Sequence, residues 1–281
     1  MHSYWFWIGS FPVRSYSTIF AAAFLLGFGV TLYFAKTRGK PGDAEHWWNL
    51  APLCLLGGIV GARVWQVFFF DWPYYRAHPG QIPLIWHGGL SIQGGIVGAC
   101  AIGYWYLRRH KLSFWRFADL GAPGILLGQS IGRDADFMNG SAYGAPTHQG
   151  FGIVFPPGTL AHAQYGSHPL WPAVIWEGQA DVILFAVLLI LMQRKKGWPP
   201  GFAIAYYLVA YDTLRFFIEM LRGDSPRFAL GWDAAQYTAL PMIAIGIVIW
   251  IYGFRKKRRV LLDGSEVEDF TKNSDEDSTE Q

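Results

Sequence analysis

The stretch AAQYTALPMIAIGIVIWIYGF, residues 234–254, decides the fold class of this chain. It contains no charged residue, and two further stretches of similar length, 17–35 and 88–107, are also free of charge. A helix of about 20 apolar residues is long enough to cross the hydrocarbon core of a bilayer. Three such stretches in a chain of 281 residues indicate a polytopic membrane protein rather than a large soluble protein with buried helices.

Less uniform apolar stretches raise the predicted number of transmembrane helices to about seven. They are residues 47–70, 117–131, 175–193 and 201–221. Arg63 interrupts the first of these, and Asp212, Arg215 and Glu219 interrupt the last. The composition fits the same class, because 52% of the residues are hydrophobic and only 15% are charged. We therefore expect an all-α fold.

The distribution of lysine and arginine predicts the orientation, because basic residues gather on the cytoplasmic side of membrane proteins. They cluster after the first, third, fifth and seventh predicted helices, at 36–40, 108–116, 194–196 and 255–259. Residues 134–193 contain no lysine or arginine, so the loop within them is expected outside. The N-terminus is therefore expected outside the cell and the C-terminus in the cytoplasm.

We expect one transmembrane domain over residues 1–259, with an external loop at about 134–175. The segment before the first helix is aromatic rather than basic and no cleavage site follows, so that helix is expected to be retained rather than cleaved as a signal peptide. Residues 260–281 are rich in Asp and Glu, which is typical of a disordered cytoplasmic tail.

Several functional classes find no support in the sequence. The net charge of +3 comes mostly from the cytoplasmic basic clusters, and no nucleic-acid-binding motif is present. His148, His162 and His168 of the external loop match no standard zinc spacing, so neither a metal nor a cofactor is predicted. Cys54 and Cys100 lie in apolar stretches and are expected to be packing residues.

The run GRDADFMNGSAYGAP, residues 132–146, places a charge at the end of a glycine-spaced apolar stretch. Arg133 belongs to a group of arginines, with Arg63, Arg215 and Arg222, that lie in predicted helices or at their ends. Ionisable groups at membrane depth are costly and usually functional. Guanidinium groups match phosphate bidentately, so we predict an outward-facing anion site. Taken alone, Arg215 and Glu219 could equally be a structural ion pair, because they lie four residues apart on one helical face.

The segment WHGGLSIQGG, residues 86–95, leads into the third predicted helix. Paired glycines there allow a close approach of the backbone to a neighbour or a ligand. Ser91 and Gln93 place polar groups in the first turns of this helix, where they could bond to another helix or take part in function.

These residues carry a family resemblance over residues 16–254. The run 132–146 resembles the central motif of the prolipoprotein diacylglyceryl transferase family, with Arg133, Phe137, Asn139 and Gly144 in place. The segment His87-Gly88-Gly89 resembles the His-Gly-Gly segment of that family. Further matches are Tyr16, residues 61–63, Asp119, Pro172 with Glu177, and Arg215, Glu219 and Arg222.

The resemblance implies a multi-pass enzyme of the bacterial plasma membrane that needs no cofactor. It would transfer the diacylglyceryl group of phosphatidylglycerol to the lipobox cysteine at the signal peptide of a prolipoprotein, the first step of lipoprotein maturation. Arg133 and Arg215 are expected to stabilise the leaving glycerol phosphate. The expected lipid-binding residues are Arg133, Arg63, Arg222, Tyr16, Asn139, Gly144 and Glu219.

The chain departs from the family pattern at the expected base. Gln93 stands where the family usually has histidine, and Asp136 stands where its central motif has asparagine. The family's HPxQLYE stretch appears here as WPAVIWE, residues 171–177, without its His, Gln and Tyr. A glutamine cannot accept a proton at neutral pH, so Gln93 cannot replace the family histidine as a base. His87 and Gln93 both remain candidates for a catalytic role, and the sequence leaves the choice between them open.

A cysteine thiol, with an ordinary pKa of about 8.5, needs a base or a positive field to become a thiolate. Three routes remain: His87 as the base, Asp136 as the base, or the field of the arginines alone. We favour the arginine field, because Asp136 lies close to Arg133 in sequence and is expected to be its ion-pair partner.

Two alternatives to an active transferase remain. The first is a catalytically impaired homologue that binds phosphatidylglycerol or lipoprotein signal peptides. The second is a transporter or channel, which the absence of a visible inverted repeat disfavours.

Overall fold

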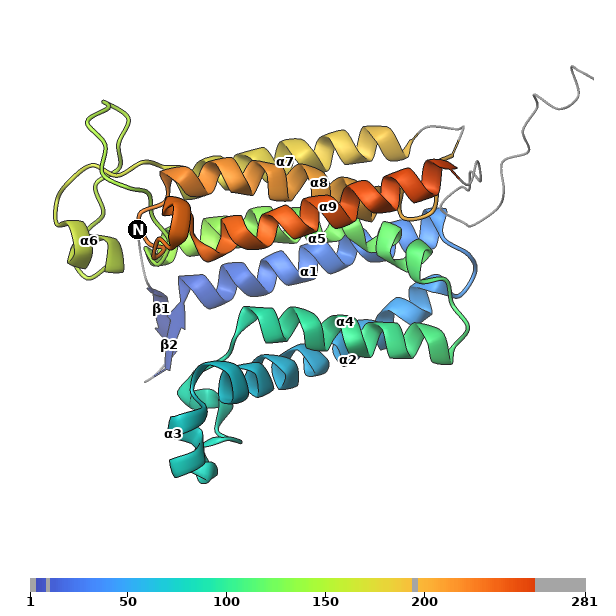
Figure 1. Cartoon of the computed structure of the whole chain (residues 1–281), viewed down its shortest axis with the longest axis horizontal. Helices are drawn as coiled ribbons and strands as arrows, with labels where there is room; N and C mark the ends of the chain where they lie inside the picture. The colour runs from blue at the N-terminus through green and yellow to red at the C-terminus, as the bar shows by residue number, and fades with distance from the viewer. Residues whose placement is uncertain (1–3, 9–10, 194–196, 256–281) are drawn as a thin grey trace, which may run out of the picture. The chain divides into compact units, whose positions relative to one another are not determined.

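The computed structural model describes residues 4–8, 11–193 and 197–255. The described part contains seven long helices, which follow the seven predicted apolar stretches (Figure 1). They are α1 (Ser15–Arg38), α2 (Asp43–Trp65), α4 (Ile92–Arg109), α5 (Phe114–Asn139), α7 (Ala173–Met192), α8 (Phe202–Ile218) and α9 (Ala234–Arg255). The predicted acidic tail, 260–281, lies outside the described residues.

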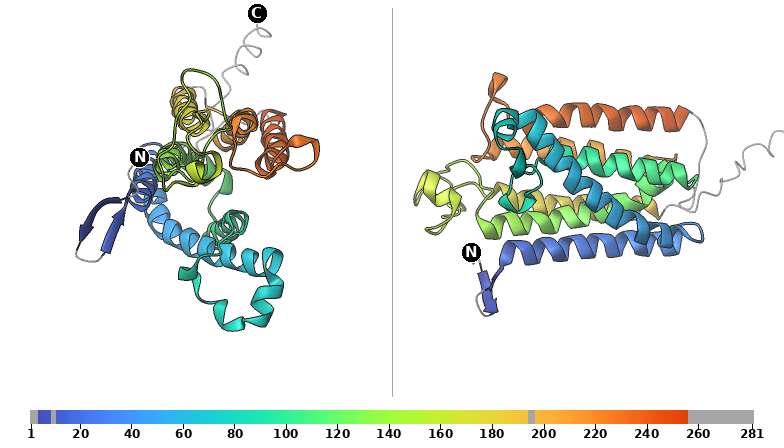
Figure 2. Two further views of the ribbon diagram at one scale, coloured as in Figure 1. Left: turned by 90° about the vertical axis from the view of Figure 1, so that its left-hand side faces the viewer. Right: turned by 90° about the horizontal axis from the view of Figure 1, so that it is seen from below.

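Short elements join these helices. They are α3 (Trp72–Ala77), α6 (Leu160–Tyr165), a π-helical turn η1 (Gln66–Phe70) and the 3₁₀ turns η2 (Pro79–Gln81), η3 (Ile85–His87), η4 (Glu219–Leu221) and η5 (Ala229–Gly231). An antiparallel hairpin of β1 (Tyr4–Ile8) and β2 (Phe11–Arg14) precedes α1, as Figure 2 shows. The fold is therefore mostly helical, with this hairpin as a departure from the all-α expectation.

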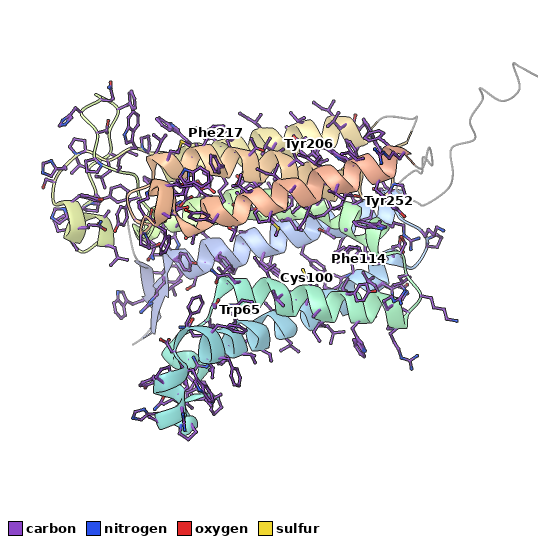
Figure 3. The ribbon with its side chains drawn as sticks, in the orientation of Figure 1. Trp65, Cys100, Phe114, Tyr206, Phe217 and Tyr252 are labelled. Carbon is purple, nitrogen blue, oxygen red and sulfur yellow. The ribbon has the colours of Figure 1, made fainter. Side chains whose placement is uncertain are left out.

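Four of the helical segments are long and apolar enough to cross a membrane: Ser15–Arg38, Asp43–Phe70, Ala173–Met192 and Ala234–Arg255. Their outer faces are apolar, and Leu25, Phe69 and Ile190 are each about two-thirds exposed. Phe217 and Tyr252, labelled in Figure 3, are 60% and 59% exposed. Large apolar side chains are stable at such exposures when lipid rather than water surrounds them. The chain is a membrane protein.

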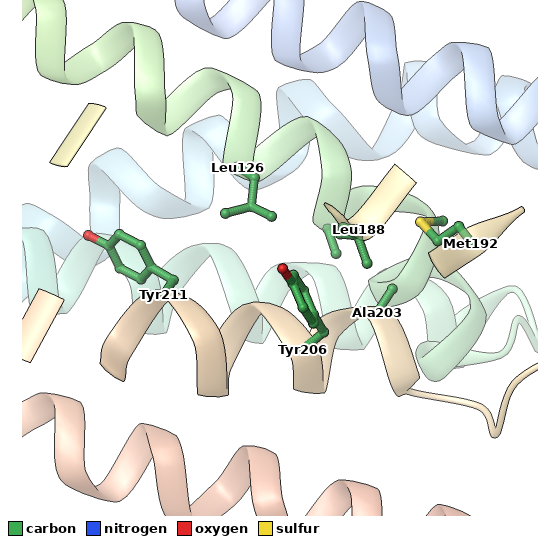
Figure 4. Packing of buried hydrophobic residues seen from close by; sticks show 7 residues of the cluster. Leu126, Leu188, Met192, Ala203, Tyr206 and Tyr211 are labelled. Atoms are coloured by element: carbon green, nitrogen blue, oxygen red, sulfur yellow. The ribbon is translucent and has the colours of Figure 1, made fainter. Parts of the chain in front are cut away.

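The described chain forms two compact units, one of residues 39–117 and one of the remaining residues. In the larger unit, α7 and α9 pack against α8, and α1 crosses α5 at paired glycines. A Cβ on Gly27 would lie 2.5 Å from the carbonyl oxygen of Gly124, so the two backbones touch there. The core between α5, α7 and α8 contains Leu126, Leu188, Met192, Ala203, Tyr206 and Tyr211 (Figure 4).

The first turn of α8 is capped by a side chain from α5. Gly201, in the left-handed region at φ 87°, is the N-cap residue that precedes the helix. The buried carboxylate of Asp119 accepts hydrogen bonds from the backbone N–H groups of Gly201 at 2.7 Å, Ala203 at 2.8 Å and Ile204 at 3.1 Å. The first N–H groups of a helix lack intrahelical partners, so Asp119 satisfies three donors that would otherwise be costly to bury.

The segment between α5 and α7 is shorter than the expected loop at 134–175. Residues 134–139 form the last turns of α5, because nothing in them breaks a helix before Gly140, which is left-handed at φ 63° and ends it. The segment then folds over a buried cluster of Tyr143, Phe155, Ala161 and Leu170. It is an ordered element with its own small core.

In the smaller unit, α2 and α4 pack with their backbones in contact. A Cβ on Gly98 would lie 2.2 Å from the carbonyl oxygen of Gly57, and one on Gly61 would lie 2.4 Å from that of Gly94. Only glycine fits such a crossing, as in small-residue interfaces of membrane helices. An ion pair between Arg116 and Asp43 at 2.8 Å closes one end of this unit.

This crossing predicts the effect of a single methyl group. Gly98→Ala is expected to lower the thermal unfolding temperature in detergent, although alanine is favoured over glycine in a helix by roughly 1 kcal/mol. The added Cβ forces α2 and α4 apart, and overpacking of this kind costs about 1–3 kcal/mol. Gly29→Ala on α1 is the control, because no heavy atom lies within 4 Å of its Cβ position. Equal unfolding temperatures for the two variants would contradict the close crossing.

Candidate functional site

A buried carboxylate, that of Glu177, lies at the centre of the candidate site. Glu177 is in the second turn of α7 and is 0% exposed. Its Oε1 lies 2.9 Å from Nη2 of Arg133 and 3.1 Å from Nη1 of Arg215. Its Oε2 lies 3.4 Å from Nη1 of Arg222. Three of the four predicted site arginines therefore meet on one residue.

The hydroxyl of Tyr211 on α8 lies within this group. It accepts hydrogen bonds from Nη2 of Arg133 at 3.1 Å and from Nη1 of Arg215 at 2.9 Å. It donates to Oε1 of Glu177 at 3.4 Å. Tyr211 therefore fixes the two guanidinium groups relative to one another and to the carboxylate.

Each arginine also has a second acidic partner. Arg133 pairs with Asp136 at 3.2 Å, which confirms the ion pair predicted from their spacing. Arg222 binds Asp224 bidentately, at 2.7 and 2.6 Å. Arg215 and Glu219 do share a helical face, but at 3.8 Å their contact is weaker than the contact of Arg215 with Glu177. We call Glu177, Arg133, Arg215, Arg222, Tyr211, Asp136, Asp224 and Glu219 the Glu177 cluster.

Gly144 positions one of these arginines through the backbone. Residues 143–145 pair with 221–223, by hydrogen bonds from Ala145 N to Leu221 O at 2.8 Å and from Gly223 N to Tyr143 O at 3.0 Å. On the other side, Trp171 N donates to Ala145 O at 2.9 Å. A Cβ on Gly144 would lie 2.2 Å from the carbonyl oxygen of Trp171. Gly144 therefore allows the chain to pass between the Arg222 segment and the start of α7.

The start of α1, which contains Tyr16, and the end of α5, which contains Asn139, lie at the same end of the larger unit as the start of α7 (Figure 1). Tyr16 is half-buried in the first turn of α1 and interacts electrostatically with Arg133 and Asp136. Its ring stacks on Phe20, with the centroids 5.9 Å apart. Asn139 is exposed at the end of α5. Of these two predicted lipid-binding residues, Tyr16 therefore interacts with members of the Glu177 cluster.

Arg63 belongs to the smaller unit and is bound differently. All five of its N–H donors are directed at backbone carbonyl oxygens between 2.6 and 3.3 Å away. These belong to Gln81, Ile82, Leu84, Gly88 and Gly89. The guanidinium also lies over the ring of Tyr75, 4.9 Å from its centroid. We expected Arg63 to bind a lipid headgroup, whereas its donors hold the 81–89 segment.

Gln93 lies in the first turn of α4, next to that segment. It is exposed, and its amide oxygen accepts a hydrogen bond from the hydroxyl of Ser91 at 2.6 Å. The backbone N–H of Ser91 donates to the carbonyl of Ala62, beside Arg63. The side chain of His87 lies outside what the structure describes. Among the described residues no group of three or more His, Cys, Asp and Glu is arranged to hold a metal ion.

Glu177, Tyr211 and Asp224 are the residues of the cluster that sequence reasoning did not assign to the site. Glu177 counted only as a family match, and Tyr211 and Asp224 were not considered. One signal was available for Glu177: it lies at the start of an apolar span, where an ionised carboxylate needs cationic partners. No comparable signal marks Tyr211.

Loss of the central charge is expected to destabilise the larger unit. Glu177→Gln keeps the shape but leaves three guanidinium groups without their shared counter-charge, and removing one partner of a buried ion pair costs about 3–5 kcal/mol. The unfolding temperature in detergent should fall accordingly. Asp134→Asn on α5 is the control, because Asp134 is exposed and has no ion pair among the described residues. A Glu177→Gln protein as stable as this control would show that Glu177 does not hold the site together.

Arg63→Lys is expected to loosen residues 81–89. A lysine ammonium offers three donors at one point and cannot reach five carbonyls arranged around a planar fork. Hydrogen exchange of the backbone amides in this segment should therefore become faster than in the unsubstituted protein. Arg76→Lys is the matched control, because Arg76 is exposed on α3 of the same unit. Unchanged exchange in Arg63→Lys would contradict the role assigned to this side chain.

Comparison with known proteins places the chain in a family. Residues 3–252 match the model of the family described as prolipoprotein diacylglyceryl transferase. A protein of Geobacillus kaustophilus, named phosphatidylglycerol–prolipoprotein diacylglyceryl transferase, is 35% identical over 246 residues, 87% of this chain and 89% of its own length. Proteins of the same name from Acaryochloris marina and Staphylococcus carnosus are 35% and 34% identical, over 88% of this chain and 89% and 88% of their own lengths. This chain belongs to the prolipoprotein diacylglyceryl transferase family.

Proposed function

We propose that this protein transfers the diacylglyceryl group of phosphatidylglycerol to the lipobox cysteine thiol of prolipoproteins, and thereby begins lipoprotein maturation. Membership of the family supports the reaction, since the relatives are named for it. The observation that carries the proposal is the convergence of Arg133, Arg215 and Arg222 in a protein with membrane-spanning helices. These groups suit an anionic phospholipid that must reach them from the bilayer.

The chemistry of the reaction explains why arginines are needed. The thiol sulfur forms a bond to the glycerol carbon while the bond from that carbon to the phosphate oxygen breaks. The thiol loses its proton, and the phosphate changes from a singly charged diester to a glycerol phosphate monoester with a second negative charge. Charge therefore builds on the leaving oxygen in the transition state, where preorganised donors lower the barrier most.

Arg133 and Arg215 are placed best for this role. Their side chains are 15% and 23% exposed, compared with 7% for Arg222. The Nε–H of Arg133 has no acceptor among the described residues, so this guanidinium retains a free donor. Arg222, bound bidentately by Asp224, is better suited to holding the resting lipid and the shape of the site. Tyr16, Asn139 and Gly144 would border or shape the entrance.

The reaction also requires that the cysteine thiol lose its proton. Asp136 is already engaged by Arg133, and Gln93 is bonded to Ser91 and cannot take a proton. We therefore assign thiolate formation to the local field at the guanidinium groups of Arg133 and Arg215, with His87 as the alternative base. The proposal includes a multi-pass position in the bacterial plasma membrane with seven crossings, the N-terminus and the 140–172 segment outside, and the basic clusters and tail in the cytoplasm.

A non-catalytic member of the family is the second candidate function. The observation that favours it is Gln93, whose amide accepts a hydrogen bond at a position where the family usually has a titratable histidine. Such a protein would bind phosphatidylglycerol or a lipoprotein signal peptide without turnover.

Transfer of labelled diacylglyceryl from phosphatidylglycerol to a lipobox peptide tests the proposal directly, alongside rescue of cells depleted of their own transferase. The protein is expected to perform both. Arg133→Ala should lower transfer by about 10²–10³-fold or more, as loss of a transition-state donor does. Arg109→Ala, in the cytoplasmic basic cluster, should leave it unchanged. A well-expressed protein that lipidates no precursor would overturn the transferase proposal in favour of a binding protein.

Gln93→His tests how the thiol is activated. If the arginine field acts alone, or if His87 is the base, this substitution should preserve the transfer rate or raise it. The rate should be measured with saturating lipid, so that changes in kcat are separated from changes in KM. A strong loss of transfer in Gln93→His would show that the site has been rebuilt around the glutamine.

A further inference from the structure

The Glu177 cluster does not carry excess positive charge. Its ion pairs link three guanidinium groups to four carboxylates, those of Glu177, Asp136, Asp224 and Glu219. With every group ionised, these described ion-paired residues have a formal charge of −1. An anionic phospholipid headgroup that approaches them therefore meets cations that are already neutralised, and its binding needs a compensating change of charge.

Asp181 is the residue that can supply this change. It lies one helical turn after Glu177 on α7, on the same face, and is 0% exposed. Neither of its carboxylate oxygens has a hydrogen-bond partner among the described residues. A buried carboxylate without donors is unusual, because such groups are almost always paired. It also has no part in the ion pairs described above.

The surroundings of Asp181 couple it to the arginines. The charged and titratable groups that interact with it electrostatically come from the three helices that meet there. They are Arg133 on α5, Glu177 on α7, and Tyr207, Tyr211 and Arg215 on α8. Because Arg133 and Arg215 are its cationic neighbours, any anion that engages these two guanidinium groups weakens the stabilisation of an ionised Asp181.

The other carboxylates of the site would lose contacts if they were protonated. Glu177 would lose guanidinium bonds, and Asp224 would lose a bidentate pair. Glu219 and Asp233 each have one oxygen without a hydrogen bond among the described residues, and that of Glu219 lies 3.8 Å from Nη2 of Arg215. Their other oxygens accept from the hydroxyl of Ser225 and from the backbone N–H of Gln236, respectively. Asp181 differs from all of these in that neither of its oxygens accepts a described hydrogen bond, so its protonation breaks none.

We propose that Asp181 takes up a proton when the phosphodiester headgroup of an anionic lipid binds to Arg133 and Arg215. The headgroup is that of phosphatidylglycerol, so this inference rests on the proposed function. The incoming negative charge replaces that of Asp181, and the total charge of the site stays constant. Asp181 acts through the two arginines and is a positioning residue for the lipid.

Isothermal titration calorimetry of the full chain in detergent tests this. The ligand is short-chain phosphatidylglycerol, whose phosphodiester does not titrate near neutral pH. Binding heats measured in buffers of different ionisation enthalpy give the number of protons taken up. Burial without donors favours the neutral form of Asp181, so the titration should extend to alkaline pH, where this group is ionised in the free protein. In that range the unsubstituted protein should take up a proton fraction approaching about one per lipid, and its affinity should fall by up to about tenfold per pH unit.

Asp181→Asn should abolish the proton uptake and make the lipid affinity independent of pH. Asp134→Asn, the exposed matched control on α5, should retain both. Asp181→Glu keeps a carboxyl group and should also retain uptake, so it serves if the asparagine variant does not fold. Infrared difference spectra of the unsubstituted protein should show a new protonated-carboxyl band on lipid addition, shifted in Asp181→Glu.

Two results would overturn the inference. Lipid binding without proton uptake in the unsubstituted protein would reject the role of Asp181 and leave the transferase proposal standing. Undiminished uptake in Asp181→Asn would assign the proton to another group. Failure of phosphatidylglycerol to bind at any pH would reject the proposed function together with this inference.

Discussion

An ionised carboxylate buried at the start of an apolar helix is the constraint on which the rest of the larger unit depends. Glu177 has no contact with solvent, so its charge must be met by cations brought from elsewhere in the chain. Arg133 comes from α5, Arg215 from α8 and Arg222 from the segment after η4. The ends of α5, α7 and α8 and the segment after η4 must therefore lie close together around this carboxylate. The close backbone passage at Gly144 serves the same requirement, because it sets the position of the Arg222 segment beside α7.

The two units solve the problem of a buried charge in opposite ways. In the larger unit, cations surround a carboxylate and form a network in which several groups share acceptors. In the smaller unit, Arg63 is surrounded by neutral carbonyl oxygens, which use all five donors of its guanidinium. A guanidinium held in this way is committed to the backbone, whereas the guanidinium groups of Arg133 and Arg215 share acceptors and remain partly exposed. This difference separates a structural arginine from arginines that can engage a ligand.

Sequence reasoning succeeded where the determining signal is local. The long apolar stretches predicted the long helices, and the paired glycines of residues 86–95 predicted a close backbone approach, which Gly94 makes to Gly61. The Arg133–Asp136 pair followed from the closeness of the two residues in sequence. The role of Glu177 was missed because its partners lie on other helices and no sequence spacing connects them. The end of α5 was placed too early because polarity was taken as a sign of a loop, whereas the left-handed Gly140 is what stops the helix. Arg63 resembled a ligand-binding arginine until its acceptors were known.

The cap that Asp119 provides for α8 has a consequence for how the protein is made. The described chain just before α8, residues 197–201, contains two prolines and two glycines, and among the first donors of that helix it accepts only the N–H of Phe202, through the carbonyl oxygen of Pro199 at 3.1 Å. The N–H groups of Gly201, Ala203 and Ile204 depend on Asp119. Bare N–H groups are poorly tolerated in a membrane, so α8 is complete only beside α5. Ribosomal synthesis delivers α5 well before α8, and the acceptor is therefore already in the bilayer when the helix that needs it emerges. The helix that supplies the cap therefore precedes, along the chain, the helix that needs it. The first turn of α8 can be capped during insertion without any later part of the chain.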